Sequence, residues 1–168
     1  GLPGHQALTA LYSTQGGTDL SSLDGILLPS PVPGTAELKD SRYYFAWSFD
    51  QTLVRSAQDF GLFGQAAVSD GNPNGLHRSF FLGVGGRGLV PGHSGDNWGI
   101  GYYYDNFSQD LKDALEPAIP LRDEQGVELF YNFALAPWCV LGLDLQIIRP
   151  ALAGDTAVLP GMRAVIRF

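Results

Sequence analysis

The chain has 168 residues, of which 45% are hydrophobic, 12% aromatic and only 16% charged, whereas soluble domains carry about 25% charged residues. No run of about 18 uninterrupted apolar residues occurs, so the sequence excludes a transmembrane helix. The net charge of −7, without a basic cluster, argues against a nucleic-acid partner, and the single cysteine, Cys139, excludes an internal disulfide.

A period of two, typical of β-strands, runs through the chain. In 42–53, Tyr43, Phe45 and Trp47 alternate with smaller or more polar residues, so that one face of the strand is aromatic. The abundance of glycine (22 residues) also suits strands and tight turns better than helices. We predict an all-β protein with eight strands, at about 5–13, 42–53, 59–69, 76–87, 97–106, 125–136, 138–148 and 157–168.

The connections divide into two sets of different length. If the last strand runs inward, one side receives 14–41, 70–75, 107–124 and 149–156, and the other receives 54–58, 88–96 and Ala136–Pro137. Long loops on one side and mostly short turns on the other are typical of outer-membrane barrels. The segment 108–116 has a Ser-led start and helical spacing, which predicts a short helix inside a long loop.

The apolar faces of these strands favour a membrane environment. Aromatic side chains lie towards strand ends, as membrane-interface girdles do, and the polar faces are rich in glycine, alanine and serine. In lipid every strand edge must be paired, which requires a closed transmembrane antiparallel β-barrel. Small residues on the polar faces, such as Gly83, Gly101 and Gly142, would underfill an eight-stranded barrel and indicate part of a wider wall.

Several segments resemble a known family in their order along the chain. They are GLFGQAAVSDGNPN (61–74), GVGGRGLVPGHSGDNWGIGYYYDNFS (83–108), DEQGVELFYNFALAPW (123–138), DLQIIRPA (144–151) and the end at Phe168. They resemble carbohydrate-selective porins of the OprB type over about the last two-thirds of the chain. The resemblance implies a sixteen-stranded outer-membrane porin for facilitated diffusion of sugars, of which this chain looks like the C-terminal half.

The start of the chain bears on this expectation. It begins at Gly1 without methionine or a charged-then-apolar leader, so either a signal peptide has been removed or the front of a longer chain is missing. We treat 1–168 as one bacterial outer-membrane β-barrel region. The expected partners are mono- or oligosaccharide solutes and outer-membrane lipid, with association into a homo-oligomer left open and no cofactor.

Strand parity selects candidate pore-lining or sugar-contacting residues. Charged and amide groups can replace a sugar's hydration in stages, and tyrosine rings can stack on its apolar ring face. The candidates are Tyr44, Asp50, Gln65, Tyr103, Glu128, Asn132, Asp144, Gln146, Arg163 and Arg167. The alternative for each is a ladder of charges that stabilises the wall without touching solute.

Other motifs do not predict chemistry. Asp70-Gly71-Asn72-Pro73-Asn74 lacks the closing glutamate of a calcium loop and favours a tight turn. The segment 83–88 lacks the Lys-Ser/Thr of a phosphate loop, and the three histidines have no metal-ligand spacing. The carboxylates at 123, 124 and 128 have no partner placed across a cleft, so we expect neither a metal nor an enzyme.

Two other functions remain open at this point. The first is a closed eight-stranded outer-membrane barrel that acts as an anchor or adhesin through its loops at 14–41 and 107–124. The second is a soluble sugar-binding β-sandwich, which would also alternate apolar and polar residues.

Overall fold

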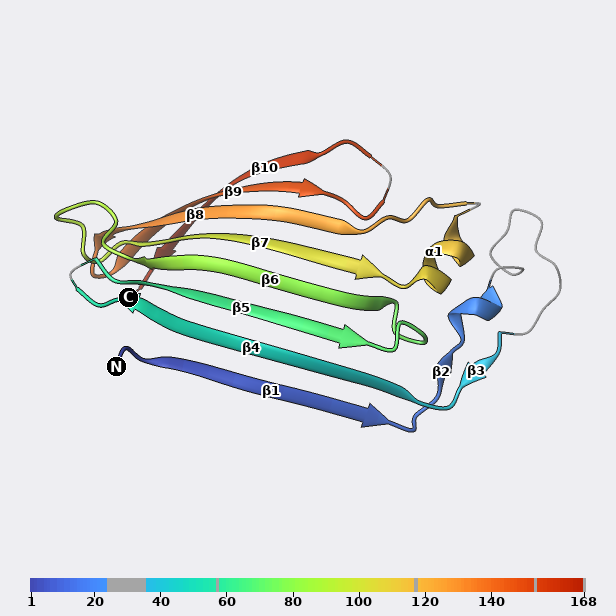
Figure 1. Cartoon of the computed structure of the whole chain (residues 1–168). Helices are drawn as coiled ribbons and strands as arrows, with labels where there is room; N and C mark the ends of the chain where they lie inside the picture. The colour runs from blue at the N-terminus through green and yellow to red at the C-terminus, as the bar shows by residue number, and fades with distance from the viewer. Residues whose placement is uncertain (24–35, 57, 117, 153, 168) are drawn as a thin grey trace.

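The computed structural model describes residues 1–23, 36–56, 58–116, 118–152 and 154–167. Eight antiparallel strands form one sheet in the order β1-β4-β5-β6-β7-β8-β9-β10, so strands that follow one another along the chain lie side by side (Figure 1). The strands are β1 Gly4–Ser13, β4 Arg42–Val54, β5 Phe60–Ser69, β6 Leu76–Arg87, β7 Asn97–Phe107, β8 Glu124–Ala136, β9 Cys139–Arg149 and β10 Ala157–Ile166.

The structure confirms all eight predicted strands, with boundaries within two residues of those expected. Each strand has 10 to 13 residues, enough for the roughly 9–11 that a tilted membrane-spanning strand needs. The expected last residue of the final strand, Phe168, lies outside the described residues, as do residues 24–35 of the predicted 14–41 loop.

Smaller elements gather at one end of the sheet (Figure 1). The strands β2 Gly17–Thr18 and β3 Leu38–Lys39 pair with each other, and the 3₁₀ helix η1 spans Leu20–Leu23. The predicted loop helix is confirmed as α1 Gln109–Leu115, whose N-cap is Ser108. Both chain ends lie at the opposite end of the sheet, beside the shorter turns.

Register gives the sheet two chemically different faces. Directly paired residues of antiparallel strands project to the same side, so the pairing can be followed from strand to strand. We call the side that carries Tyr44, Gln65 and Glu128 the polar face, and the side that carries Trp47 and Leu129 the apolar face.

The apolar face is banded. One row across six strands contains no aromatic residue, and consists of Leu62, Val84, Ile100, Leu129, Leu145 and Pro160. Aromatic pairs lie on either side of it: Phe80 and Tyr102, with ring centroids 5.6 Å apart, and Phe60 and Trp98, 6.5 Å apart. An aliphatic band between two aromatic belts is the pattern of a lipid-facing barrel wall.

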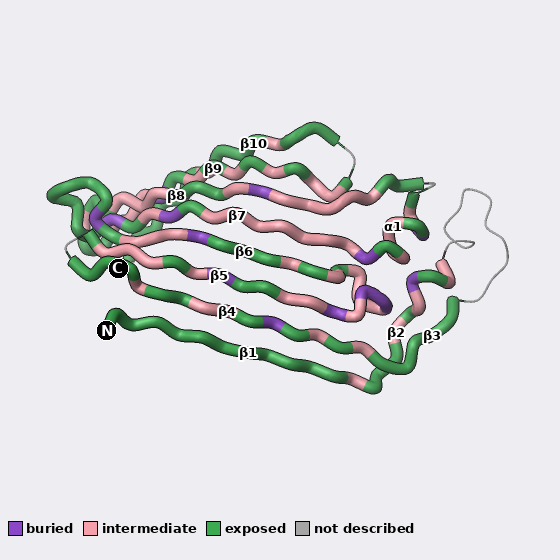
Figure 2. Tube along the Cα trace, in the orientation of Figure 1, coloured by how far each residue is buried: buried purple, intermediate pink, exposed green. Residues whose placement is uncertain are grey.

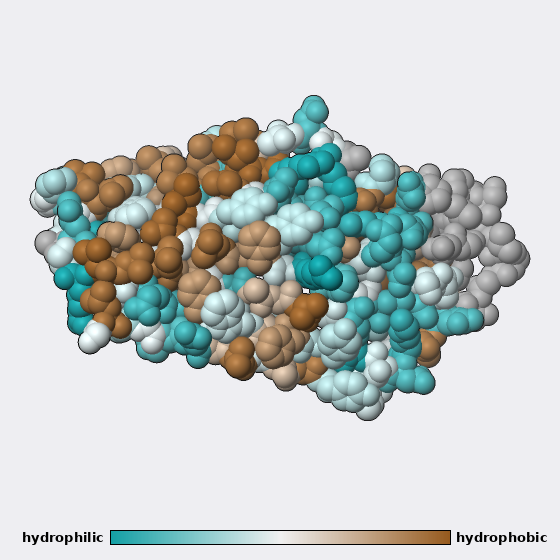
Figure 3. All heavy atoms as spheres, viewed as in Figure 1, coloured by the Kyte–Doolittle hydropathy of each residue, from teal (hydrophilic) through white to brown (hydrophobic). Residues whose placement is uncertain are grey.

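This surface stays largely uncovered. Leu8 is 71% exposed, Met162 76% and Leu82 49%, whereas the buried hydrophobic residues of the described chain are only Leu20, Ala46 and Ala114. Figure 3 shows one side of the molecule, on which hydrophobic atoms gather over the strands away from α1 and hydrophilic atoms gather towards α1. Within the described residues no helix has the length and apolar character needed to cross a bilayer.

The sheet has two open edges. β1 and β10 are its outermost strands and are exposed along almost their whole length (Figure 2). Within the described residues no second large sheet covers either face, so the β-sandwich alternative is wrong for this fold. The closed eight-stranded barrel is also not what the structure shows, because β1 and β10 are not paired with each other.

Candidate functional site

The polar face carries the residues selected by parity. Nine of the ten lie within strands, and the pairing places them on one side of the sheet: Tyr44, Asp50, Gln65, Tyr103, Glu128, Asn132, Asp144, Gln146 and Arg163. The tenth, Arg167, directly follows β10, and its backbone N–H donates to the carbonyl of Trp138 at 2.8 Å.

Four of these residues surround one hollow of about 470 Å³ over β8, β9 and β10. They are Glu128, Asn132, Asp144 and Arg163. They lie in successive rows of paired residues, so that an amide, two carboxylates and a guanidinium are presented from three neighbouring strands. The hollow therefore offers hydrogen-bond donors and acceptors together, which suits a solute covered in hydroxyl groups.

A second hollow of about 390 Å³ lies nearer the end with the short turns, between β5 and β8. Its polar-face lining includes Phe63, Arg87, Asn97 and Phe130. Phe130 lines both hollows and so connects them. Phe63, Arg87 and Asn97 are absent from the predicted set, although continuing the alternation from Gln65 and Tyr103 would have selected Phe63 and Asn97.

The other predicted residues are more dispersed. Tyr44, Asp50 and Gln65 lie on β4 and β5, at the far side of the sheet from the first hollow. Asp50 contacts the His5 ring, with Oδ2 3.0 Å from Nδ1, and the Tyr103 hydroxyl donates to Glu124 at 3.0 Å. These two residues are thus engaged in contacts between strands, as the charge-ladder alternative describes.

Aromatic rings cover the glycines of the polar face. A Cβ added to Gly83, Gly99 or Gly101 would lie only 2.6–2.7 Å from the ring of Phe63, Phe130 or Phe81, respectively. Tyr103 covers Gly126 in the same way, at 2.6 Å. The small residues therefore do not leave a wall of bare backbone. They leave room for rings from neighbouring strands to lie close against it.

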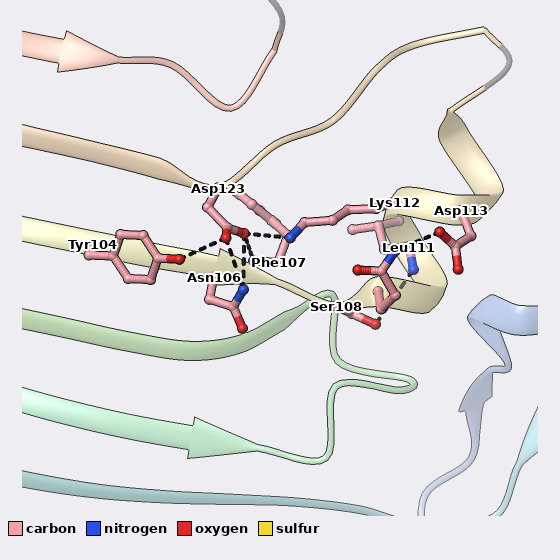
Figure 4. A network of polar contacts seen from close by, with 9 residues as sticks. Tyr104, Asn106, Phe107, Ser108, Leu111, Lys112, Asp113 and Asp123 are labelled. Atoms are coloured by element: carbon pink, nitrogen blue, oxygen red, sulfur yellow. Dashed lines mark hydrogen bonds and ion pairs between the residues drawn. The ribbon is translucent and has the colours of Figure 1, made fainter.

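Asp123 anchors the loop that contains α1 (Figure 4). Its carboxylate accepts hydrogen bonds from the Tyr104 hydroxyl at 2.7 Å and the Phe107 backbone N–H at 3.0 Å, and lies 2.6 Å from Lys112 Nζ. Partial burial alone would raise the pKa of Asp123, but Lys112 and these hydrogen bonds hold it at about 2. The strand end and the helix are thereby joined by one carboxylate.

Asn72 connects three segments at the same end. Its side-chain amide donates to Asp19 and Asp110, both at 2.7 Å, and its oxygen accepts from the Leu20 backbone N–H at 2.9 Å. The amide lies in the 70–75 turn and Asp110 lies in α1. Asn72 is buried, so these bonds are shielded from water and hold together the loops at the end of the sheet that carries α1.

Asp96 plays the same role at the other end, in the 88–96 turn. It is 2% exposed and accepts hydrogen bonds from the Tyr131 hydroxyl and the Ala134 backbone N–H, both at 2.8 Å. Burial opposes its ionisation, but these donors and the nearby His93 hold the pKa of Asp96 below its ordinary value. This turn, longer than a minimal hairpin, is therefore an ordered structure.

The described residues hold no group of three or more histidine, cysteine, aspartate or glutamate side chains placed to bind a metal ion. They form a sheet with polar and aromatic groups on one face and an apolar surface suited to contact lipid on the other.

A family model described as the carbohydrate-selective porin, OprB family, matches residues 1–168. The chain belongs to this family. No curated protein matches it. Among solved structures, the high-pH structure of Pseudomonas putida OprB is similar, with a TM-score of 0.83 and 20% sequence identity. The match covers 98% of this chain and 44% of that one, so the chain spans less than half the length of this OprB.

Family membership confirms the resemblance seen in the sequence and places the chain in the bacterial outer membrane. The structural match confirms the antiparallel outer-membrane porin fold. The family is one of porins, which are transport channels rather than enzymes.

Proposed function

We propose that the polar face lines a water-filled path through which mono- or oligosaccharides cross the outer membrane by facilitated diffusion. The observation that carries this proposal is the register. Polar and aromatic candidates from six strands share one side, and a banded apolar surface occupies the other. One face then meets water and sugar while the other meets lipid.

The path needs no chemical step, and we propose that the chain carries out no catalysis. A sugar entering from water exchanges hydrating waters for groups such as Glu128, Asn132 and Arg163, while rings such as Phe130 contact its apolar ring face. Because these contacts are weak and distributed over two hollows, the sugar can leave as readily as it enters.

The open edges require partners. β1 runs towards the end that carries the long loops and β10 runs away from it, so each edge can accept an antiparallel strand. In lipid an unpaired edge leaves backbone N–H and C=O groups unsatisfied, at several kcal/mol each. We propose that further strands complete a wider barrel, sixteen in all. Association into a homo-oligomer stays a prediction, which mass measurement in detergent tests.

Sugar flux through membrane-extracted protein in lipid vesicles tests the proposal. We expect Arg163→Ala to change both the sugar flux and the ion selectivity, because it removes a cation from the first hollow. Val158→Ala is the matched control, since Val158 lies on the apolar face of the same strand and does not line the hollow. Equal flux and selectivity in wild type and Arg163→Ala would contradict the assignment of the polar face to the path.

A further inference from the structure

A cluster of cations lies at the top of the apolar face, where the long loops begin. Tyr104, Gln125 and Arg149 occupy one row of that face, on β7, β8 and β9. The loop that contains Lys112 and Arg122 folds beside this row, and the two together line an open hollow of about 340 Å³. We call this hollow, lined by these five residues with Leu121 and Asp123, the rim pocket.

The rim pocket is positive in a chain that is negative as a whole. It holds three cations, Lys112, Arg122 and Arg149, against one carboxylate, Asp123, whereas the whole chain has 10 cationic and 17 anionic residues. Such a concentration of positive charge favours an anionic ligand.

The three cations differ in how far they are engaged. Lys112 is paired with Asp123 at 2.6 Å. Arg122 donates to the carbonyls of Pro150 at 2.9 Å and Gly154 at 2.6 Å, contacts that fix the guanidinium without neutralising its charge. Arg149 is exposed and has no carboxylate partner within the described part of the chain. A fixed and an unneutralised guanidinium thus face the same hollow.

The position of the rim pocket identifies the ligand class. Immediately below it on the same face lie Tyr102, Val127 and Ile147, part of the surface that meets acyl chains. In outer-membrane barrels the long loops are on the extracellular side, so the pocket lies at headgroup level of the outer leaflet. That leaflet consists of lipopolysaccharide, whose headgroup carries phosphates, and arginine is well suited to bind phosphate.

We propose that the rim pocket binds the phosphorylated headgroup of an outer-leaflet lipopolysaccharide, with Arg122 and Arg149 as the phosphate ligands and the apolar face below them in contact with its acyl chains. The bound lipid would also cover the loop anchor at Asp123. This site lies on the opposite face from the sugar path, so its occupation and sugar flux can be measured separately.

The test measures binding of purified deep-rough lipopolysaccharide to the membrane-extracted protein in detergent, after removal of endogenous lipid. Arg149→Gln should weaken binding roughly fivefold, as loss of one cation near a membrane surface does. Arg149→Lys, which keeps the charge, should restore most of it. Arg55→Gln is the matched control, because Arg55 is exposed in the turn at the other end of the sheet, and it should bind as wild type does.

A comparison of two lipids on the wild-type protein tests the proposal even if Arg149→Gln does not fold. Wild type should bind the phosphorylated lipid more tightly than the same lipid after dephosphorylation, and added salt should reduce the difference. Equal binding of the two lipids, or equal losses in Arg149→Gln and Arg55→Gln, would overturn the proposal. Inorganic phosphate that displaced the lipid efficiently at matched ionic strength would assign the pocket to a free anion and overturn it as well.

Discussion

Replacing Asp123 with asparagine should loosen the α1 loop from the strands. The pKa of this carboxyl is lowered from 3.8 to about 2, and one pH unit corresponds to about 1.4 kcal/mol, so the ionised form stabilises the loop by about 2 kcal/mol. The side chain is 26% exposed, and solvent screening reduces the expected loss in Asp123→Asn to about 1–2 kcal/mol. Because the pKa is lowered, this stabilisation is present above pH 4 and is lost as the pH falls towards 2.

Hydrogen exchange of the backbone amides of α1 measures the loss directly. Local opening that is easier by about 1–2 kcal/mol should speed exchange by roughly five- to thirtyfold in Asp123→Asn at constant pH. Asp113→Asn is the control, because Asp113 is exposed and, among the described residues, its side chain accepts a hydrogen bond only from Gln109 of the same helix. If α1 exchanged equally fast in the two variants, the carboxylate at 123 would not be the anchor.

Three further changes test other parts of the structure. Gly101→Ala should push the Phe81 ring, 2.6 Å from the added Cβ, into the path and lower sugar flux with little loss of stability; unchanged flux would refute the ring placement. Asp96→Asn should cost about 1–3 kcal/mol and lower the temperature at which gel mobility changes on heating, because it weakens two hydrogen bonds to a buried carboxylate. Asn72→Ala should speed amide exchange at Leu20, whose N–H loses its acceptor, and leave α1 less protected; unaltered exchange would contradict the loop junction.

The strands could be predicted because each has one polar and one apolar face. In β4 the alternation of Tyr43, Phe45 and Trp47 with smaller residues persists over the whole strand, so a local pattern contains the structural information. The α1 helix was also predictable, since the Ser108 hydroxyl that caps it, accepting from the Leu111 N–H at 3.5 Å, is adjacent in sequence. Local signals therefore gave both the elements and the sidedness of the wall.

Contacts between distant segments could not be predicted in this way. The bonds of Asn72 to Asp19 and Asp110 join residues 53 and 38 positions apart, and no periodic pattern links them. The pair β2 and β3 was missed because two-residue strands show no period. Phe63 was left out although it shares the parity of Gln65, because only polar groups and tyrosines were selected; its pairing with Asp50 places it on the polar face, over Gly83.

Cysteine labelling of adjacent positions tests the central claim most directly, namely that one face meets water and the other lipid. In a background with Cys139 replaced by serine, Gln65→Cys and Ala66→Cys differ by one residue and project to opposite faces of β5. We predict that a charged, membrane-impermeant thiol reagent modifies the cysteine at 65 in lipid vesicles, more slowly when sugar is added, and leaves that at 66 unmodified. Equal labelling at the two positions, or labelling at 66 alone, would contradict the account.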